Sequence, residues 1–145
     1  MNILFFLTPK SEVAYIYDDD TLRQALEKME YHRYTAVPII DHKDGTYIGT
    51  ITEGDLLWDI KEWHDLNMLD AEDVPILSVK RKRDNEPVAA DANIEDLISK
   101  VMNQNFVPVI DDDERFIGII TRKDVIQYLS RKCGMEEELL FMAVE

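Results

Sequence analysis

The sequence repeats itself in order, and this duplication limits the possible folds more than any other feature. The run VPIID at 37–41 returns 70 residues later as VPVID at 107–111. A second block at 47–55 returns 69 residues later at 116–124, with Gly, Thr and Asp at matching places. Apolar positions upstream of these blocks match at a spacing of 72. The spacing therefore falls from 72 to 70 to 69 along the chain, which means that the second copy is shorter only between elements, where loops tolerate change. We therefore expect two copies of one small structural unit.

Each copy predicts the order strand, helix, strand, strand, helix. The runs 36–40 and 106–110 do not alternate between apolar and polar residues, which indicates strands covered on both faces. Turns at 43–45 and 111–114 join each run to the next strand as a hairpin. The first helix of each copy is marked by apolar residues at the spacing of one helix face, namely Leu22, Ala25, Leu26 and Met29, then Ile94, Leu97, Ile98 and Val101.

The second helix of each copy begins after a threonine. These helices follow Thr52 and Thr121 and are expected to end near Asn67 and Lys132. An amphipathic stretch at 136–144 predicts one more short helix. The expected divisions are a first repeat at 1–67, a linker with a basic run at 68–84, a second repeat at 85–134 and a C-terminal tail at 135–145.

Neither repeat is large enough to be stable alone, because two helices and three short strands bury only a marginal core. The two apolar sheets would be covered most simply by each other. We therefore expect an α+β fold of two pseudo-symmetric repeats packed sheet to sheet. A cleft along their join would be a common kind of ligand site.

Composition excludes several classes of function. The chain carries 16 Lys+Arg and 30 Asp+Glu, and its net charge of −14 argues against nucleic-acid binding, which needs a basic face. Its single cysteine, Cys133, can form neither an intramolecular disulfide nor a structural zinc site by itself. No signal peptide and no apolar stretch of membrane-spanning length is evident, so we expect a cytoplasmic protein without membrane contact.

The repeated motif Gly-x-x-Thr-x-x-Asp carries the candidate chemistry. It comprises Gly49, Thr52 and Asp55 in the first copy and ends on Thr121 and Asp124 in the second. Each threonine stands where a helix N-cap belongs, next to N–H groups that can hold a phosphate. Each aspartate can accept hydrogen bonds from a ribose diol. The alternative is a plain capping box, although a cap leaves other N–H groups available for a ligand.

These residues give the chain a resemblance to a tandem pair of cystathionine-beta-synthase (CBS) domains, the Bateman module. The resemblance covers about 6–129 and rests on the segment LTPK at 7–10, both VPxID strands and both Gly-x-x-Thr-x-x-Asp junctions. It implies a regulatory module that binds an adenosine-containing ligand: AMP, ADP, ATP, S-adenosylmethionine or cyclic di-adenosine monophosphate. It also implies a disc-like homodimer.

Carried over by position, the resemblance implies two sets of ligand-binding residues. Asp55 and Asp124 would bind ribose hydroxyls, and Thr52 and Thr121 would contact ribose or phosphate. The adenine would lie against the first strands and the residues around each proline, although these apolar positions could equally be core. The first-strand and proline-flanking residues are Val13, Ala14, Tyr15, Thr35, Ala36, Val37 and Pro38 in the first repeat, and Asn85, Val88, Asn105, Phe106, Val107 and Pro108 in the second.

The two sites differ in local charge. Arg122 and Lys123 lie between Thr and Asp in the second motif, where cations near a helix N-terminus favour a phosphate, whereas the first motif has Glu53 there. The Asp124 site is therefore the better candidate for a phosphorylated ligand. The basic run at 80–83, Arg81 in particular, and its counterpart Lys10 are candidates for phosphate contacts; solvated side chains are the alternative for all of these cations.

No catalytic or metal site is indicated. His32, His42 and His64 lie on separate elements without metal-ligand spacing, and no nucleophile lies beside a base. We expect a non-enzymatic sensor of an adenine nucleotide that needs no cofactor, binds its ligand between the repeats and signals to an effector protein. The alternatives are a ligand-free dimerisation or interaction module and, less favoured, an enzyme using Asp55 and Asp124 as acid and base.

Overall fold

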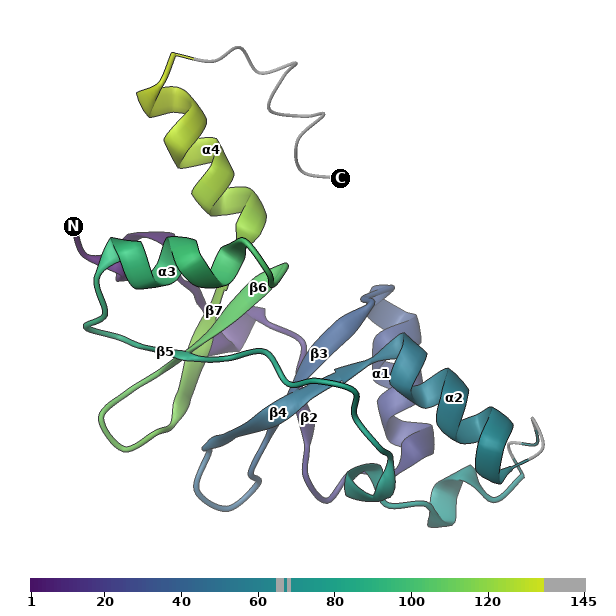
Figure 1. The fold of residues 1–145 in the computed structure, drawn as a ribbon. Helices are drawn as coiled ribbons and strands as arrows, with labels where there is room; N and C mark the ends of the chain where they lie inside the picture. Colours follow the sequence, from purple (N-terminus) through teal and green to yellow (C-terminus); the bar gives the residue numbers. More distant parts are fainter. Residues whose placement is uncertain (65–66, 68, 135–145) are drawn as a thin grey trace. The chain divides into compact units, whose positions relative to one another are not determined.

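The computed structural model describes residues 1–64, 67 and 69–134. The chain forms two compact units (Figure 1): one is Ala14–Asp84, and the other joins Met1–Val13 to the chain from Asn85 onward. The described helices are α1 (Leu22–His32), α2 (Glu53–Trp63), α3 (Ile94–Val101) and α4 (Arg122–Lys132). The described strands are β1 (Thr8–Pro9), β2 (Ile16–Tyr17), β3 (Ala36–Ile40), β4 (Tyr47–Thr52), β5 (Val88–Ala89), β6 (Phe106–Ile110) and β7 (Phe116–Thr121). The α+β class and the repeated strand, helix, strand, strand, helix order are confirmed.

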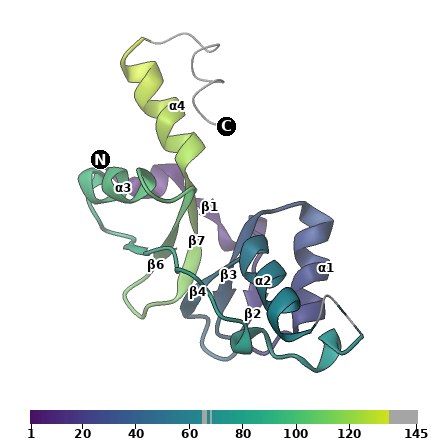
Figure 2. The same ribbon diagram turned by 45° about the vertical axis from the view of Figure 1, so that its right-hand side comes forward.

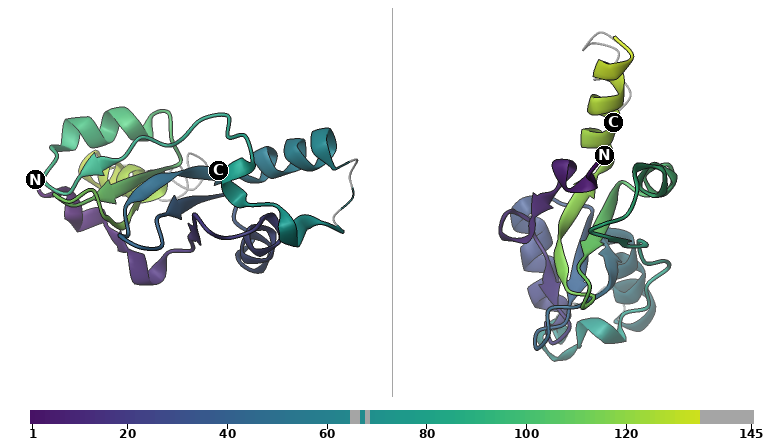
Figure 3. Two further views of the ribbon diagram at one scale, coloured as in Figure 1. Left: turned by 90° about the horizontal axis from the view of Figure 1, so that it is seen from below. Right: turned by 90° about the vertical axis from the view of Figure 1, so that its left-hand side faces the viewer.

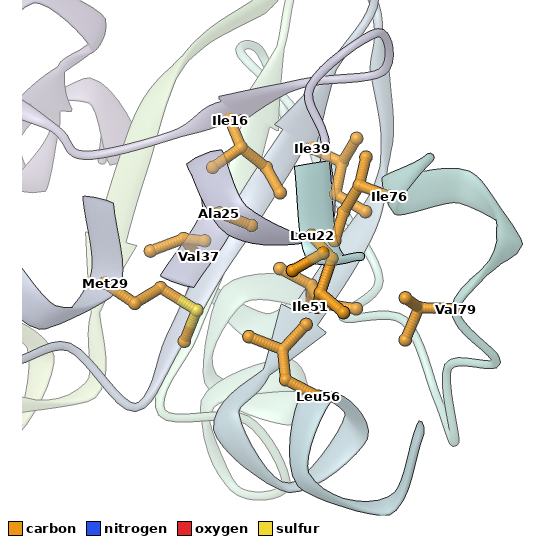
Figure 4. Close-up of a cluster of buried hydrophobic side chains, with 11 residues drawn as sticks. Ile16, Leu22, Ala25, Met29, Val37, Ile39, Ile51, Leu56, Ile76 and Val79 are labelled. Atoms are coloured by element: carbon orange, nitrogen blue, oxygen red, sulfur yellow. The ribbon is translucent and has the colours of Figure 1, made fainter. Parts of the chain in front are cut away.

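The Ala14–Asp84 unit contains a sheet in the order β2-β3-β4. β2 runs parallel to β3, and β3 and β4 form the expected antiparallel hairpin, in which Ala36 pairs with Thr52. α1 begins at Thr21 with a reciprocal capping box and ends at Arg33, whose φ of 58° is left-handed. Side by side with α2 (Figure 2), it covers a core that includes Ile16, Leu22, Met29, Ile51 and Leu56 (Figure 4).

The segment expected as a linker contributes to this same core. After α2, the chain forms the short 3-10 helices η3 (Ala71–Asp73) and η4 (Ile76–Ser78). Ala71, Ile76 and Val79 are at most 2% exposed and belong to the cluster drawn in Figure 4. α2 ends at Trp63, earlier than the expected Asn67, and His64 is its C-cap. The expected helix at 136–144 lies outside the described residues.

The second unit contains a sheet in the order β1-β7-β6-β5. β1 lies along β7 on the side opposite β6 (Figure 3), with Thr8 paired to Ile119. Gly118 permits this approach, because a Cβ there would lie 2.2 Å from the carbonyl oxygen of Thr8. The sequence-based division counts residues 1–13 with the first repeat, but in the structure this β-pairing joins them to the second.

The core of this second unit draws on its N-terminal segment as well as on its helices. Ile3 and Phe6, from the 3-10 helix η1 (Ile3–Phe6), are buried together with Leu97, Val107 and Ile120. The aromatic ring of Phe6 also meets that of Tyr128 on α4 edge-on, at 5.2 Å between centroids. Each repeat is therefore completed by short 3-10 segments, which follow the first repeat directly but lie far from the second in sequence. None of the described helices is long and apolar enough to cross a membrane.

Candidate functional site

The two motif threonines are helix N-caps, as predicted. The hydroxyl of Thr52 accepts a hydrogen bond from the backbone N–H of Asp55 at 3.0 Å, and the hydroxyl of Thr121 accepts one from that of Asp124 at 3.2 Å. Both threonines have extended backbone angles before their helices, which is the usual N-cap geometry. The capping interpretation is thus correct for both copies. It leaves open what each aspartate carboxylate does.

The carboxylate of Asp55 is occupied by the chain itself. One oxygen accepts a hydrogen bond from the Thr52 N–H at 3.1 Å, which completes a reciprocal capping box. The other oxygen accepts one from the N–H of Lys82 at 3.1 Å. Asp55 is only 7% exposed. A buried carboxylate with both oxygens bonded to backbone N–H groups has little capacity left for a ribose diol.

The carboxylate of Asp124 is in a different state. It is half-buried, and it has no hydrogen-bond or ion-pair partner among the residues that the structure describes. The hydroxyl of Thr121 lies one helical turn away at the same helix end. Asp124 therefore combines acceptor oxygens with the partial positive charge of the α4 N-terminus.

The residues before each proline are brought to the motif of their own repeat. The carbonyl oxygen of Asn105 accepts a hydrogen bond from the Arg122 N–H at 2.8 Å, and that of Thr35 accepts one from the Glu53 N–H at 2.9 Å. In register, Phe106 pairs with Thr121 just as Ala36 pairs with Thr52. Sequence-distant candidates are thus adjacent within each unit.

Several apolar candidates lie inside the cores. Val37 is 2% exposed and Val107 is fully buried, while Phe106 is 8% exposed. Pro38 and Pro108 are buried as well. The core-packing alternative therefore describes the valine side chains, which belong to the hydrophobic clusters of their units. Thr35 and Asn105 are exposed and Ala36 is half-buried, so these side chains are accessible.

The basic candidates have distinct environments. The Nε of Arg122 donates to the carbonyl oxygen of Val101 at 2.7 Å, which anchors this guanidinium at the C-terminal end of α3. Lys123 is exposed. Lys10 is half-buried in the 3-10 turn η2 (Lys10–Glu12). Arg81 is paired with Asp84, with its Nε 2.8 Å from Oδ1 and its Nη2 3.3 Å from Oδ2.

The expected first-strand residues of the first repeat precede their strand, whereas Val88 of the second repeat lies in β5. Val13, Ala14 and Tyr15 are half-buried and end before β2 begins at Ile16, and Val13 belongs to the other compact unit. The ring of Tyr15 meets that of Tyr17 edge-on at 5.5 Å. A side-chain hydrogen bond with Tyr17, together with burial, raises the pKa of Tyr15.

Asp84 is a residue that the sequence analysis did not single out. Its Oδ1 accepts a hydrogen bond from the N–H of Thr50, on β4, at 2.9 Å. The hydroxyls of Thr50 and Tyr47 lie 2.6 Å apart. Burial, with the nearby charge of Asp84 adding to it, raises the pKa of Tyr47 to about 12. Only the tertiary structure reveals this contact, because an aspartate after a basic run resembles any solvated residue.

A buried glutamine supports the start of β6, and it too was not predicted. Gln104 donates to the carbonyl oxygens of Glu86 and Phe106, at 3.1 and 3.3 Å, and accepts from the Glu86 N–H at 2.8 Å. Asn85 also donates to the Phe106 carbonyl oxygen, at 3.1 Å. These bonds fix the start of β6, where Phe106 pairs with Thr121. No sequence motif marks Gln104, since its partner Glu86 lies 18 residues away.

A groove of about 720 Å³ lies in the Ala14–Asp84 unit, beside the start of α2. Its walls come mainly from α1 and α2. The lining residues are Leu26, Met29, Glu30, Arg33, Tyr34, Glu53, Gly54, Leu56, Leu57 and Ile60. Glu53 and Gly54, which lie between the motif threonine and aspartate, line this groove, whereas Thr52 and Asp55 do not. Among the described residues, no group of three or more His, Cys, Asp or Glu side chains is placed to hold a metal ion.

A comparison with known protein families supports the interpretation of the repeated motif. The family model described as CBS domain matches residues 6–62 and again 78–131. The chain belongs to the CBS domain family. The two CBS matches correspond to the two repeats expected from the duplicated blocks, and the resemblance inferred from the sequence is confirmed.

Individual CBS proteins resemble this chain over most of its length. Cyclic di-AMP receptor B of Bacillus subtilis is 26% identical over 130 residues, covering 87% of this chain and 84% of the receptor. The crystal structure of CbpB in complex with c-di-AMP matches with a TM-score of 0.79 and 26% identity, over 90% of this chain and 85% of that one. The uncharacterized protein MJ1225 of Methanocaldococcus jannaschii is 24% identical over 142 residues, and this chain spans 50% of its length.

Proposed function

We propose that this CBS protein is a regulatory module that binds an adenosine-containing ligand through the Asp124 motif and signals its presence to an effector protein. The observation that carries the proposal is the Asp124 carboxylate, which is half-buried beside a capped helix N-terminus and unpartnered in the described part of the chain. Similarity to a cyclic di-AMP receptor supports the ligand class.

Each part of such a ligand finds a matching group at this site. The Asp124 oxygens can accept hydrogen bonds from ribose hydroxyls. The first-turn N–H groups of α4 and the side chains of Arg122 and Lys123 favour a phosphate. The exposed Asn105, held beside Arg122 by the 2.8 Å backbone hydrogen bond, can contact the base. These groups bind and orient a nucleotide, and they include no nucleophile with a base beside it.

Cyclic di-adenosine monophosphate is the first ligand to test, with AMP, ADP, ATP and S-adenosylmethionine as alternatives. The reason is the 26% identity with cyclic di-AMP receptor B, which extends over 84% of that receptor. Binding without catalysis predicts that the nucleotide is recovered intact after long incubation. Mass spectrometry of the purified protein and of such a mixture would identify a co-purified ligand and reveal any turnover.

Replacing the motif aspartate tests the proposal directly. Asp124→Asn should weaken binding of the nucleotide about 10- to 100-fold, because a charged acceptor of two ribose hydroxyls is lost. Isothermal titration calorimetry measures the change. Asp112→Asn, in an exposed turn of the same unit, removes the same charge and should leave the affinity within about 2-fold. Equal affinities for Asp124→Asn and wild type would contradict the assignment.

A second candidate function, self-association, is favoured by exposed apolar side chains on α2. Leu57, Trp58 and Trp63 are 52%, 56% and 75% exposed, and Leu57 also lines the α1–α2 groove. Exposed apolar side chains beside an apolar groove mark a candidate interaction surface. We expect a homodimer that Trp58→Glu converts to monomer in light-scattering measurements. Met102→Glu, at a 75% exposed position of the other unit, is the control. A monomeric wild type at micromolar concentration would remove this candidate.

A further inference from the structure

We propose that the first CBS motif is filled by the chain's own linker, so that Asp124 marks the one nucleotide site of each chain. Lys82 contacts Asp55, Asp84 contacts β4, and Arg81 pairs with Asp84; we call these three residues the linker clamp. The part concerning nucleotide binding rests on the proposed function. The part concerning the clamp rests only on contacts within the Ala14–Asp84 unit.

The first contact of the linker clamp occupies the carboxylate of Asp55. The Lys82 N–H donates to Asp55 at 3.1 Å, while the Thr52 N–H donates to the other oxygen at 3.1 Å. A ribose could bind Asp55 only by displacing the Lys82 backbone. Hydrogen bonds to a buried charged group are strong, so this displacement would weaken binding roughly 10-fold or more.

The second contact places a carboxylate against the glycine of the same motif. A Cβ on Gly49 would lie 2.5 Å from the Oδ1 of Asp84, so the glycine leaves room for this side chain. The same Oδ1 accepts the Thr50 N–H at 2.9 Å and pairs with the Nε of Arg81 at 2.8 Å. Arg81, which the sequence offered as a phosphate ligand, thus neutralises Asp84.

The equivalent places in the second motif are occupied differently. Gly118 faces the backbone of β1, since its Cβ would lie 2.2 Å from the Thr8 carbonyl oxygen and 3.1 Å from the Cα of Pro9. The following residues, Lys10–Glu12, wind into a 3-10 turn. Within the described chain no side-chain or backbone group bonds the Asp124 carboxylate. One motif therefore holds its own linker, and the other keeps its ligand-binding oxygens available.

The binding experiment compares how much ligand is bound before and after removal of Asp124. In calorimetric titrations with cyclic di-adenosine monophosphate, Asp124→Asn should leave no site of wild-type affinity and only binding weakened about 10- to 100-fold, because Asp55 provides no second site. Retention of half of the sites at wild-type affinity would overturn the inference. Failure of the wild type to bind any of the adenosine ligands would overturn the proposed function instead.

A second experiment tests the linker clamp without any ligand. Asp84→Ala should lower the melting temperature by about 5 °C, because the Thr50 N–H and Arg81 lose their partner. Asp112→Ala, an exposed acidic residue, should change it by less than about 1 °C. If Asp84→Ala had the same melting temperature as the wild type, the proposed linker clamp would be refuted, whatever the binding experiment shows.

A double-mutant cycle connects the clamp to the motif glycine. Gly49→Ala should lower the melting temperature in the wild type, because its methyl group displaces the Asp84 carboxylate. In the Asp84→Ala background the same change should cost less than half as much, since the group it meets is gone. Equal effects in the two backgrounds would mean that Asp84 does not occupy the motif in solution.

Discussion

At the scale of single residues, the same aspartate in two copies of one motif does two different things. Asp55 is a buried acceptor for two backbone N–H groups, and Asp124 is half-buried without a side-chain partner in the described part of the molecule. Burial and hydrogen bonding of a carboxylate decide whether it stabilises a fold or remains able to bind a ligand. A motif match alone therefore does not identify a binding site.

Tyr47 allows a prediction at this scale. Its pKa is raised to about 12 mainly by burial, so the neutral phenol is the form that the folded state favours. The stabilising contribution is complete below about pH 10 and is lost as the pH rises through about 12. Urea denaturation at pH 8 and pH 11 should show a smaller loss of stability for Tyr47→Phe than for wild type.

The same substitution has an effect at neutral pH. Tyr47→Phe removes the 2.6 Å hydrogen bond with the hydroxyl of Thr50 and should lower the free energy of unfolding by about 1 kcal/mol. Tyr31→Phe, at an 83% exposed position on α1, is a matched control that should have almost no effect. Identical pH profiles for Tyr47→Phe and wild type would contradict the assigned environment of Tyr47.

At the scale of elements, helix starts are specified by local sequence. α2 and α4 both begin immediately after the predicted threonine, and α1 begins after Thr21 with its own capping box. The two motif caps differ, however, because the reciprocal bond from Thr52 N–H to the aspartate is present in the first motif, while the described contacts of the second motif show only the threonine bond.

This difference predicts unequal costs of removing the caps. Thr52→Ala should lower the free energy of unfolding by about 1–2 kcal/mol and Thr121→Ala by about 0.5–1 kcal/mol. The larger cost arises because loss of the Thr52 hydroxyl disturbs a buried Asp55 that also holds Lys82. Chemical denaturation of both variants measures the difference. A Thr121→Ala protein that is the less stable of the two would refute this ranking.

At the scale of the whole molecule, each compact unit includes a segment that lies outside its strand, helix, strand, strand, helix repeat. Residues 1–13 supply η1 and β1 to the unit that contains the second motif, and residues 71–79 supply buried side chains to the unit with the first. The expected linker is therefore structural over much of its length. Its removal or redesign would expose part of a hydrophobic core.

Ile76 tests this role of the linker. It is fully buried within the Ala14–Asp84 unit, so Ile76→Ala should lower the free energy of unfolding by about 2–5 kcal/mol. Leu77→Ala, the next residue, is 46% exposed and should cost well under half as much. Equilibrium denaturation compares the two variants directly. Equal costs would show that the segment does not pack as described.

The duplication, the order of elements and the positions of the helix caps could all be predicted from the sequence. These features depend on local rules: apolar spacing along one helix face, threonine before a first turn, and short apolar runs joined by tight turns. They were sufficient to indicate the family and to select residues at both motifs. Asn105 and Thr35 could be associated with those motifs only through the resemblance, because their backbone bonds to Arg122 and Glu53 cross between elements.

Which motif keeps its carboxylate available depends on contacts between distant parts of the chain. The bond from Lys82 to Asp55 joins residues 27 apart, and the bond from Thr50 to Asp84 joins residues 34 apart. The pairing of Thr8 with Ile119 spans most of the chain. No local pattern encodes such contacts, because they depend on where distant backbone groups come to lie once both cores have formed. The repeat can therefore be recognised in the sequence, whereas the different availability of the Asp55 and Asp124 carboxylates results from the fold.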